Sequence, residues 1–448
     1  MQTNPLSDPS PTRPYNLIQL PSPDNSPQFP QETSPEEASK QRWKVLFLIC
    51  STTFGAYFVQ SLLLRANVVR EKVFDINGRD FARYVKWITG YLYLIPLVAG
   101  LMIYRFGINK TFRCFMLPVI LGSLLTVLSF MVERSDVYLY GDSMIKGSTL
   151  GLWVAQIYMI IKWFKGKELS FAIGVLGFFK GLNFFLGTLM NSSVERIGLL
   201  PLLSFGVVVC VLAGVAAIFM GKIDMTVRQE DGGALVEEEE AKLNKPITIA
   251  LAIIIICFKL GERERWAYLG FLFTRSQTFY KAFMKVELFA IFAPIILFPL
   301  FGSFVDRKEG RTAGVFSSFL LFVIGNMLFS RIIEPVESDS SLILLVACLL
   351  FQIGSYLFEV SFWGVLGSVT PKKFLGVILG VAYSLTYFGP QFLVLLMPDP
   401  ESGGVFAIGF ALVVGIVSMF YTWVSLKKKE DFRRGDNQPQ IIMPAEAN

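Results

Sequence analysis

Long apolar runs, each separated from the next by a short polar stretch, follow one another along almost the whole chain. A helix that crosses the hydrocarbon core of a bilayer needs about 20 apolar residues, and about twelve runs approach or exceed that length. They are residues 43–64, 85–106, 112–132, 137–164, 168–190, 199–221, 246–273, 282–304, 312–331, 340–369, 374–397 and 403–426. With 53% hydrophobic and only 17% charged residues, the chain is predicted to be an all-α, multi-spanning membrane protein.

A polar stretch at residues 222–245, which contains the acidic run Glu237 to Glu240, divides the apolar runs into two groups of six. Lys and Arg are concentrated in alternate connections. Because these residues accumulate on the cytoplasmic side of a membrane, both termini are predicted to be cytoplasmic. The predicted organisation is a disordered cytoplasmic tail at 1–42, a six-helix half at 43–221, a cytoplasmic linker at 222–245, a second six-helix half at 246–426 and a cytoplasmic tail at 427–448.

Several classes of function are excluded by what the sequence lacks. The chain has no histidine, which removes catalytic triads, imidazole proton relays and histidine-based zinc sites. It also has no phosphate-binding loop of the kind that ATP-driven transport needs. We therefore expect no enzyme, no metal and no cofactor, and we read the net charge of +6 as cytoplasmic bias, not as nucleic-acid binding. Secondary transport or facilitated diffusion remains.

Ionisable residues inside the apolar runs are the candidates for function, because a charge at bilayer depth costs about 2.5–3.5 kcal/mol or more and usually faces a cavity or a partner. Lys180 lies near the middle of the run 168–190, and Asn183 shares its helix face. Gly177 and Gly181 are spaced so that another helix can approach closely. Either Lys180 is neutralised by a carboxylate of a facing helix, or it binds a solute carboxylate in a central cavity, which is the interpretation that we favour.

The fourth run carries Asp142 and Lys146, which are four residues apart and therefore on one helix face. Gln156 continues the same polar stripe, which is typical of a helix that lines water or the bundle interior. An internal Asp142–Lys146 ion pair and a gating role are both compatible with this pattern. Tyr57 in the first run is compatible with a solute-facing position or with packing.

The seventh run is unusual because four consecutive charged residues, Glu262 to Arg265, follow Gly261. They surround a helix, so they cannot all face one cavity. Either the helix breaks near Gly261, where irregular backbone lines a water-filled space, or the charges pair with neighbours, for example Glu262 with Arg265. A gate and a solvated helix end are both open interpretations.

Two further carboxylates lie within apolar runs, Glu287 in the eighth and Glu359 in the tenth. Glu359 is flanked by apolar residues on both sides. Three roles fit this position: a counter-ion for Lys180, a carboxylate that couples transport to protons, or a contact for a solute amine.

Two segments about half a chain apart resemble each other. The second hinge segment, residues 302–311, carries Gly302, Asp306, Arg307, Gly310 and Arg311, and the first hinge segment, residues 100–110, follows the same spacing with Tyr104 in place of the Asp. This pattern resembles the loop between the second and third helices of each half in the major facilitator superfamily of transporters. The resemblance implies alternating access, with the glycine allowing close approach and Asp306 locking the cytoplasmic face.

The turn Trp163–Leu169 (sequence WFKGKEL) resembles that between the fourth and fifth helices of the lysosomal dipeptide transporters of this superfamily. This closer resemblance implies uniport of dipeptides from an acidic compartment and a heavily glycosylated, single-span accessory protein. Lys180 matches the family's cationic Arg. The chain departs from the family at Ser61, where the family has Asp, at Asp142, where it has Arg, and at Leu150, where it has an acidic residue that binds the amine.

Other functions remain open at this point. A transporter of organic anions or amino acids uses the same lysine without a cavity of peptide length, and a membrane scaffold or sensor moves no solute. A lysosomal or endosomal membrane is the expected location, with the plasma membrane as the alternative. The expected partners are a small carboxylate-bearing solute and the lipid bilayer.

Overall fold

The computed structural model describes residues 35–65, 92–165, 168–230, 244–275, 295–307, 310–331 and 340–395, with positions 415, 420, 422 and 424. The described residues from Gln41 onward belong to one compact unit. Glu287, most of the last predicted span and most of both predicted tails lie outside the described residues. The labelled helices are α1 (Pro35–Arg65), α4 (Ile95–Phe106), α5 (Ile108–Met131), α6 (Ser135–Phe164), α7 (Leu169–Ile197), α8 (Leu199–Glu230), α9 (Lys245–Arg275), α11 (Gly310–Arg331), α12 (Ser340–Val369) and α13 (Lys372–Leu395).

The described residues form only helices, which confirms the predicted all-α class. A helix satisfies all its backbone hydrogen bonds internally, so it is the element that an apolar segment adopts in lipid. Six of the described helices are long and apolar enough to cross a membrane, and a shorter apolar helix, Ile295–Asp306, precedes the second hinge segment. Helix α8 continues to Glu230, into the predicted linker.

Glycine makes the two tightest turns between described helices. Gly107 has a φ of 82° and separates α4 from α5, and Gly198 has a φ of 87° and separates α7 from α8. Only glycine adopts these angles without steric cost, and the Gly107 N–H donates to the carbonyl of Ile103 at 3.1 Å, which ends α4. These turns place consecutive helices against one another.

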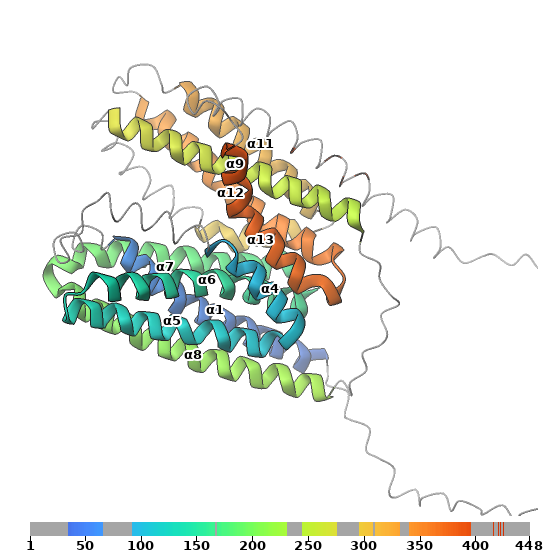
Figure 1. Ribbon diagram of the computed structural model, residues 1–448. Coiled ribbons are helices and arrows are strands. Elements are labelled where there is room, and N and C mark those ends of the chain that lie inside the picture. Colours follow the sequence, from blue (N-terminus) through green and yellow to red (C-terminus); the bar gives the residue numbers. More distant parts are fainter. Residues whose placement is uncertain are drawn as a thin grey trace, which may run out of the picture. The chain divides into compact units, whose positions relative to one another are not determined.

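Helices α5, α6 and α8 lie side by side, with α5 between the other two (Figure 1). Small residues allow the close contacts, as is common between helices in lipid. A Cβ on Gly122 would meet the Gly141 carbonyl oxygen at 2.8 Å, and a Cβ on Gly141 would meet Thr126. The surface of α8 turned away from these contacts is apolar, with Leu212 63% exposed, as expected of a helix that faces lipid tails.

Aromatic rings hold the later helices together. Phe258 of α9 stacks on Phe358 of α12 with ring centroids 3.8 Å apart, and Phe319 and Phe322 of α11 pack against Phe258. All four side chains are buried. This cluster holds α9 against α12. Lys259 directly follows Phe258 and Glu359 directly follows Phe358, so the same packing positions these two charged residues.

Candidate functional site

Lys180 lies on an aromatic surface made by two other helices. Its Nζ is 4.4 Å from the ring centroid of Trp153 on α6 and 5.6 Å from that of Tyr57 on α1. Among the residues that the structure describes, no carboxylate lies within 4.0 Å of this ammonium, although Glu359 is within electrostatic range. The predicted alternative of an ion pair that neutralises Lys180 is therefore not seen in the described part of the chain.

The aromatic residues around Lys180 continue from α6 onto α12 and α13. Trp153 approaches Tyr57 at 6.4 Å and Tyr383 at 6.2 Å between ring centroids. Tyr383 in turn contacts Trp363 at 5.9 Å, and its hydroxyl is 3.3 Å from that of Tyr387. Helices that are far apart in the sequence thus contribute to one group of aromatic side chains, which we call the aromatic lining. Its members are Tyr57, Trp153, Trp363, Tyr383 and Tyr387.

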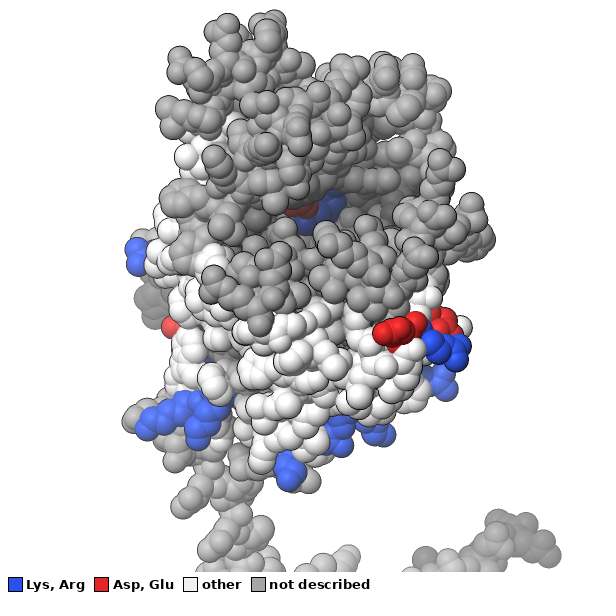
Figure 2. Space-filling model, turned by 90° about the vertical axis from the view of Figure 1, so that its left-hand side faces the viewer, with Lys and Arg blue, Asp and Glu red and all other residues white. Residues whose placement is uncertain are grey.

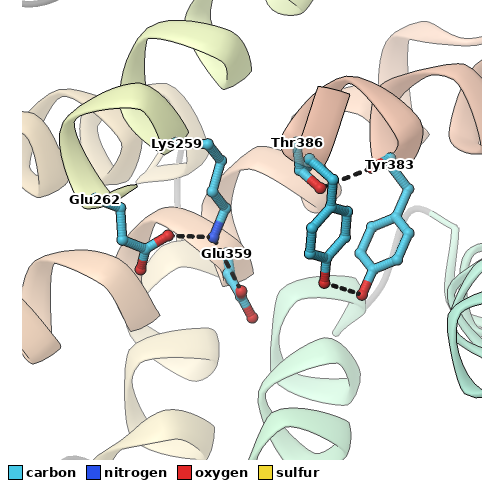
Figure 3. A network of polar contacts seen from close by, with 6 residues as sticks. Lys259, Glu262, Glu359, Tyr383 and Thr386 are labelled. Atoms are coloured by element: carbon cyan, nitrogen blue, oxygen red, sulfur yellow. Dashed lines mark hydrogen bonds and ion pairs between the residues drawn. The ribbon is translucent and has the colours of Figure 1, made fainter. Parts of the chain in front are cut away.

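A charged network lies on α9 and α12 near Tyr383 (Figure 3). The Lys259 ammonium donates to the Glu262 carboxylate at 2.7 Å and to the Glu359 carboxylate at 3.5 Å. The three side chains are between 18% and 23% exposed, so they are accessible and not sealed in the protein interior. Glu359 therefore has Lys259 as its ion-pair partner, not Lys180 as one interpretation of the sequence had it.

The network also distinguishes between the two interpretations of the seventh run. Helix α9 is continuous from Lys245 to Arg275, so it does not break at Gly261. Glu262 pairs with Lys259, three residues earlier, while the side chain of Arg265 lies outside the described residues. Lys259 is the site residue that the sequence analysis missed. The signal was available, because i, i+3 spacing places Lys259 and Glu262 on one face.

Two predicted solute contacts, Asn183 and Gln156, make hydrogen bonds to neighbouring groups of the protein. Asn183 is fully buried, its side-chain amide donates to the Phe179 carbonyl at 2.7 Å, and its own carbonyl accepts a bond from Ser61. Gln156 is also fully buried, and its amide donates to the Thr52 hydroxyl at 3.3 Å. The backbone oxygen of Asn183 and the side chain of Gln156 therefore connect α7 and α6 to α1, while the side-chain oxygens of both residues have no hydrogen-bond partner among the described residues. Their role as solute contacts stays a prediction.

Asp142 and Lys146 form the ion pair that the fourth run suggests, with Nζ and Oδ2 2.7 Å apart. The Asp142 side chain is only 4% exposed. The pair lies within a single helix and joins no two elements, so this geometry supplies no gate on its own.

Figure 2 shows a recess in one face of the molecule, with acidic and basic side chains visible at its base.

Asp306 joins the second hinge segment to the start of α7. Its carboxylate accepts the backbone N–H of Ser170 at 3.0 Å and of Phe171 at 2.8 Å, which are free donors at a helix N-terminus. Arg311 donates to the same carboxylate at 2.9 and 3.3 Å. The carboxylate thus holds a helix end and a guanidinium together, and its role as a lock stays a prediction.

Gly302 makes that lock possible. A Cβ at this position would meet Phe171 Cα at 2.6 Å and the carbonyl of Ser170, all of them backbone atoms that cannot move aside cheaply. A Cβ on Gly310 would also be too close to backbone, 2.8 Å from the Val305 oxygen. Arg307, the remaining residue of the predicted lock, is exposed, and no described residue forms an ion pair with it.

The first hinge segment makes a close approach without a lock. A Cβ on Gly100 would meet the Gly376 carbonyl and, at 3.1 Å, Gly380 Cα, both on α13. Tyr104, at the place of Asp306, is 56% exposed. The polar groups nearby belong to a different contact: Asp224 of α8 accepts bonds from Lys162 and Trp163 of α6 and from Asn109 of α5.

Two segments of similar spacing, around Gly100 and Gly302, make close helix contacts in an otherwise all-helical set of described residues. The sequence profile of the Major Facilitator Superfamily matches residues 84–393. The chain belongs to this superfamily. It is accordingly a multi-pass integral membrane transporter of the superfamily's fold.

Individual relatives are more distant. The chain is 24% identical to Lysosomal dipeptide transporter MFSD1 of Bos taurus over 379 residues, which cover 78% of this chain and 77% of the relative. It is 22% identical to the Homo sapiens protein of that name over the same length and shares. The crystal structure of the human organic anion transporter MFSD10 (TETRAN) superposes with a TM-score of 0.62 at 13% identity, covering 85% of this chain and 99% of that one. This last likeness shows the fold alone.

Proposed function

We propose that the protein moves small carboxylate-bearing solutes, dipeptides foremost, by alternating access of its two six-helix halves, and that it works as a uniporter. The observation that carries the proposal is Lys180, whose ammonium lies on Trp153 and Tyr57 with no carboxylate within ion-pairing distance in the described part of the chain. A solute carboxylate completes this site.

The energetics favour a ligand at Lys180. An ammonium away from bulk water is stabilised by about 2 kcal/mol when it lies against aromatic faces, which is less than the cost of placing a charge at bilayer depth. A carboxylate adds a charge-assisted hydrogen bond, which is about twice as strong as a neutral one. The solute supplies the missing anion, and the aromatic lining supplies surface for its apolar parts.

The compartment and partners are proposed by resemblance. The relatives named above are lysosomal dipeptide transporters, so we place this chain in a lysosomal or endosomal membrane with both termini in the cytoplasm. A single-span, heavily glycosylated accessory protein is proposed on the same basis. In this orientation the Asp306 contact closes the cytoplasmic side.

Replacing Lys180 tests the proposal. Lys180→Ala is expected to lower dipeptide uptake into proteoliposomes by about a hundredfold, the effect of losing charge-assisted bonds to a buried anion. Lys180→Arg retains part of the activity, because it keeps the charge but changes the reach. Lys165→Ala, which removes an exposed lysine, is the matched control and keeps full uptake.

The choice of competitor separates the remaining functions. Dipeptides with an amidated C-terminus are expected to compete poorly, and equal competition by amide and acid would refute the role of Lys180. Free amino acids or organic anions that outcompete dipeptides would indicate the wider carboxylate class. A purified protein that moves no solute from a broad panel would indicate a scaffold or sensor.

A further inference from the structure

The charges around the aromatic lining are separated by sign. On α7 the described charge is the single cation Lys180. On α9 and α12 the network holds one lysine and two glutamates, Lys259, Glu262 and Glu359, and therefore carries one net negative charge. The two groups are close enough for Lys180 to interact electrostatically with Glu359. A site with a positive and a negative pole matches a solute that is itself a zwitterion.

Lys259 does not satisfy its two carboxylates equally. It is 2.7 Å from Glu262, one turn away on the same helix, and 3.5 Å from Glu359 across to α12. A distance of 3.5 Å is long for a bond between ionised groups, which is about 2.7–2.9 Å. Glu359 therefore keeps capacity for a second, closer cation, and at 23% side-chain exposure it is accessible to one.

Two buried polar groups next to these poles lack a hydrogen-bond partner among the described residues. Ser355 Oγ, one turn before Glu359 on the same face of α12, belongs to a side chain that is 5% exposed. The Trp153 Nε1 lies on the ring under Lys180, in a side chain that is 2% exposed. A buried donor left unsatisfied costs about 1–3 kcal/mol, so each of them is suited to a polar group of a ligand.

From these observations we infer that Glu359, supported by Ser355 and Glu262, binds the ammonium end of the solute, and that Lys259 is a resident cation that holds Glu359 while the site is empty. The inference rests on the proposed function, since the solute carboxylate is assigned to Lys180. An arriving ammonium group displaces Lys259 from its weaker contact with Glu359, and Lys259 stays paired with Glu262.

This arrangement lets a bound zwitterion connect two helices. A zwitterion that occupies both poles connects Lys180 on α7 to Glu359 on α12, two helices that already contact each other. A solute with only one of the two charges reaches one pole and leaves the other helix unconnected. The site therefore selects solutes with an amine and a carboxylate at a fixed separation, which is the chemistry of a short peptide.

Three probes that differ by one charge test the inference: alanyl-alanine, its N-acetyl derivative and its C-terminal amide, each used as competitor of labelled alanyl-alanine uptake into proteoliposomes. In the wild type, N-acetylation is expected to weaken competition at least about tenfold, as loss of a charge-assisted bond does. In Glu359→Gln this penalty falls below about threefold, while the penalty for amidation stays. Asp224→Asn removes another buried, lysine-paired carboxylate, far from the poles, and keeps the full N-acetyl penalty.

A second variant guards against a Glu359→Gln protein that fails to fold. Lys259→Met leaves the two carboxylates without their cation, so alanyl-alanine is expected to raise the thermal midpoint of this variant more than that of the wild type. The N-acetyl probe gives no such extra stabilisation. Equal extra stabilisation by both probes would overturn the assignment.

The outcomes also distinguish this inference from the proposed function. If the wild type takes up alanyl-alanine and the N-acetyl probe competes equally, the ammonium subsite is refuted and the transport of carboxylates stands. If alanyl-alanine is neither bound nor moved, the proposed function fails, and the inference fails with it.

Discussion

The two hinge segments differ in how each of them contacts its neighbouring helix. In the second segment, Gly302 brings backbone against the start of α7, and Asp306 then bonds two backbone N–H groups and Arg311. In the first segment, Gly100 also brings backbone close to α13, but the corresponding residue is Tyr104, which has no carboxylate and is largely exposed. One contact combines shape with charge, and the other relies on shape.

This difference shows that close approach and locking are two separate requirements, although the hinge pattern contains residues for both. Close approach needs only the absence of a Cβ, and both segments meet it. Locking needs an anion at a helix N-terminus, where free N–H groups and the helix dipole favour negative charge, and only the second segment meets it. The first turn of α13 carries Lys372 and Lys373 and no acidic residue. We infer that closure at this end of the molecule depends on one polar contact, not two.

The largest effect is expected from removing the close approach itself. Gly302→Ala places a Cβ against the backbone of Ser170 and Phe171, and overpacking of this kind costs about 1–3 kcal/mol. We expect uptake to fall at least about tenfold and thermal stability to drop. Gly100→Ala should have a smaller effect, since its nearest Cα is at 3.1 Å and not at 2.6 Å.

Gly221→Ala is the matched control for both substitutions. It lies in α8, where an added Cβ makes only ordinary contact, 3.5 Å from Arg113. Alanine is also a better helix former than glycine, so this variant should be as stable as the wild type. If all three variants behave alike, close approach is not what the two hinge segments share.

An intermediate effect is expected from the lock. Asp306→Asn keeps the side-chain shape but removes the charge that Arg311 and the N-terminus of α7 bind, and charge-assisted bonds are worth about 1.5–3 kcal/mol. Because Asn keeps one acceptor oxygen, only the difference between a charge-assisted and a neutral bond is lost, and the ratio of open to closed molecules at this end should rise about fivefold. Spin labels at Lys165 and Ala313, both exposed, report the distance between the halves once the exposed Cys114 is replaced by serine.

Tyr104→Phe is the control for the lock, because it changes the corresponding residue of the unlocked segment without altering charge. It should leave the label distances unchanged. An Asp306→Asn protein with the wild-type distance distribution would mean that Gly302 alone keeps this end closed, and the contrast between the two segments would lose its functional meaning.

Much of this fold could be predicted from the sequence, because membrane helices follow from run length and hinge segments from glycine spacing. The pattern also singled out Asp306, and its carboxylate does make polar contacts with the start of α7 and with Arg311; that these contacts lock the cytoplasmic face stays a prediction. The partners were not. Glu359 lies a hundred residues after Lys259, and only the packing of α9 on α12 through Phe258 and Phe358 brings the two charges together.

Helical periodicity alone left the neighbours of the site residues open. Helical periodicity places Asn183 on the face of Lys180, but it does not say which helix covers that face, and α1 covers Asn183 through Ser61. Likewise, four consecutive charges suggested a broken helix, whereas pairing between Lys259 and Glu262 is compatible with a continuous one. Helical periodicity shows on which side of its own helix a side chain lies. Whether that side chain packs or binds depends on the neighbouring helices, which periodicity does not identify.

The smallest effect is expected from adding the missing lock. Tyr104→Asp puts a carboxylate at the position that corresponds to Asp306, next to an α13 N-terminus that carries two lysines and no acid. A negative charge at a helix N-terminus contributes about 0.3–1 kcal/mol, so opening, and with it uptake, should slow about two- to fivefold. Labels at the exposed Lys110 and Lys373 should show a narrower distance distribution. Tyr104→Asn has the same size without the charge, and an equal slowing in that variant would show that the loss of the ring, not a new lock, is responsible. Faster uptake in Tyr104→Asp would mean that the two segments are not equivalent in position, and the comparison between them would fail.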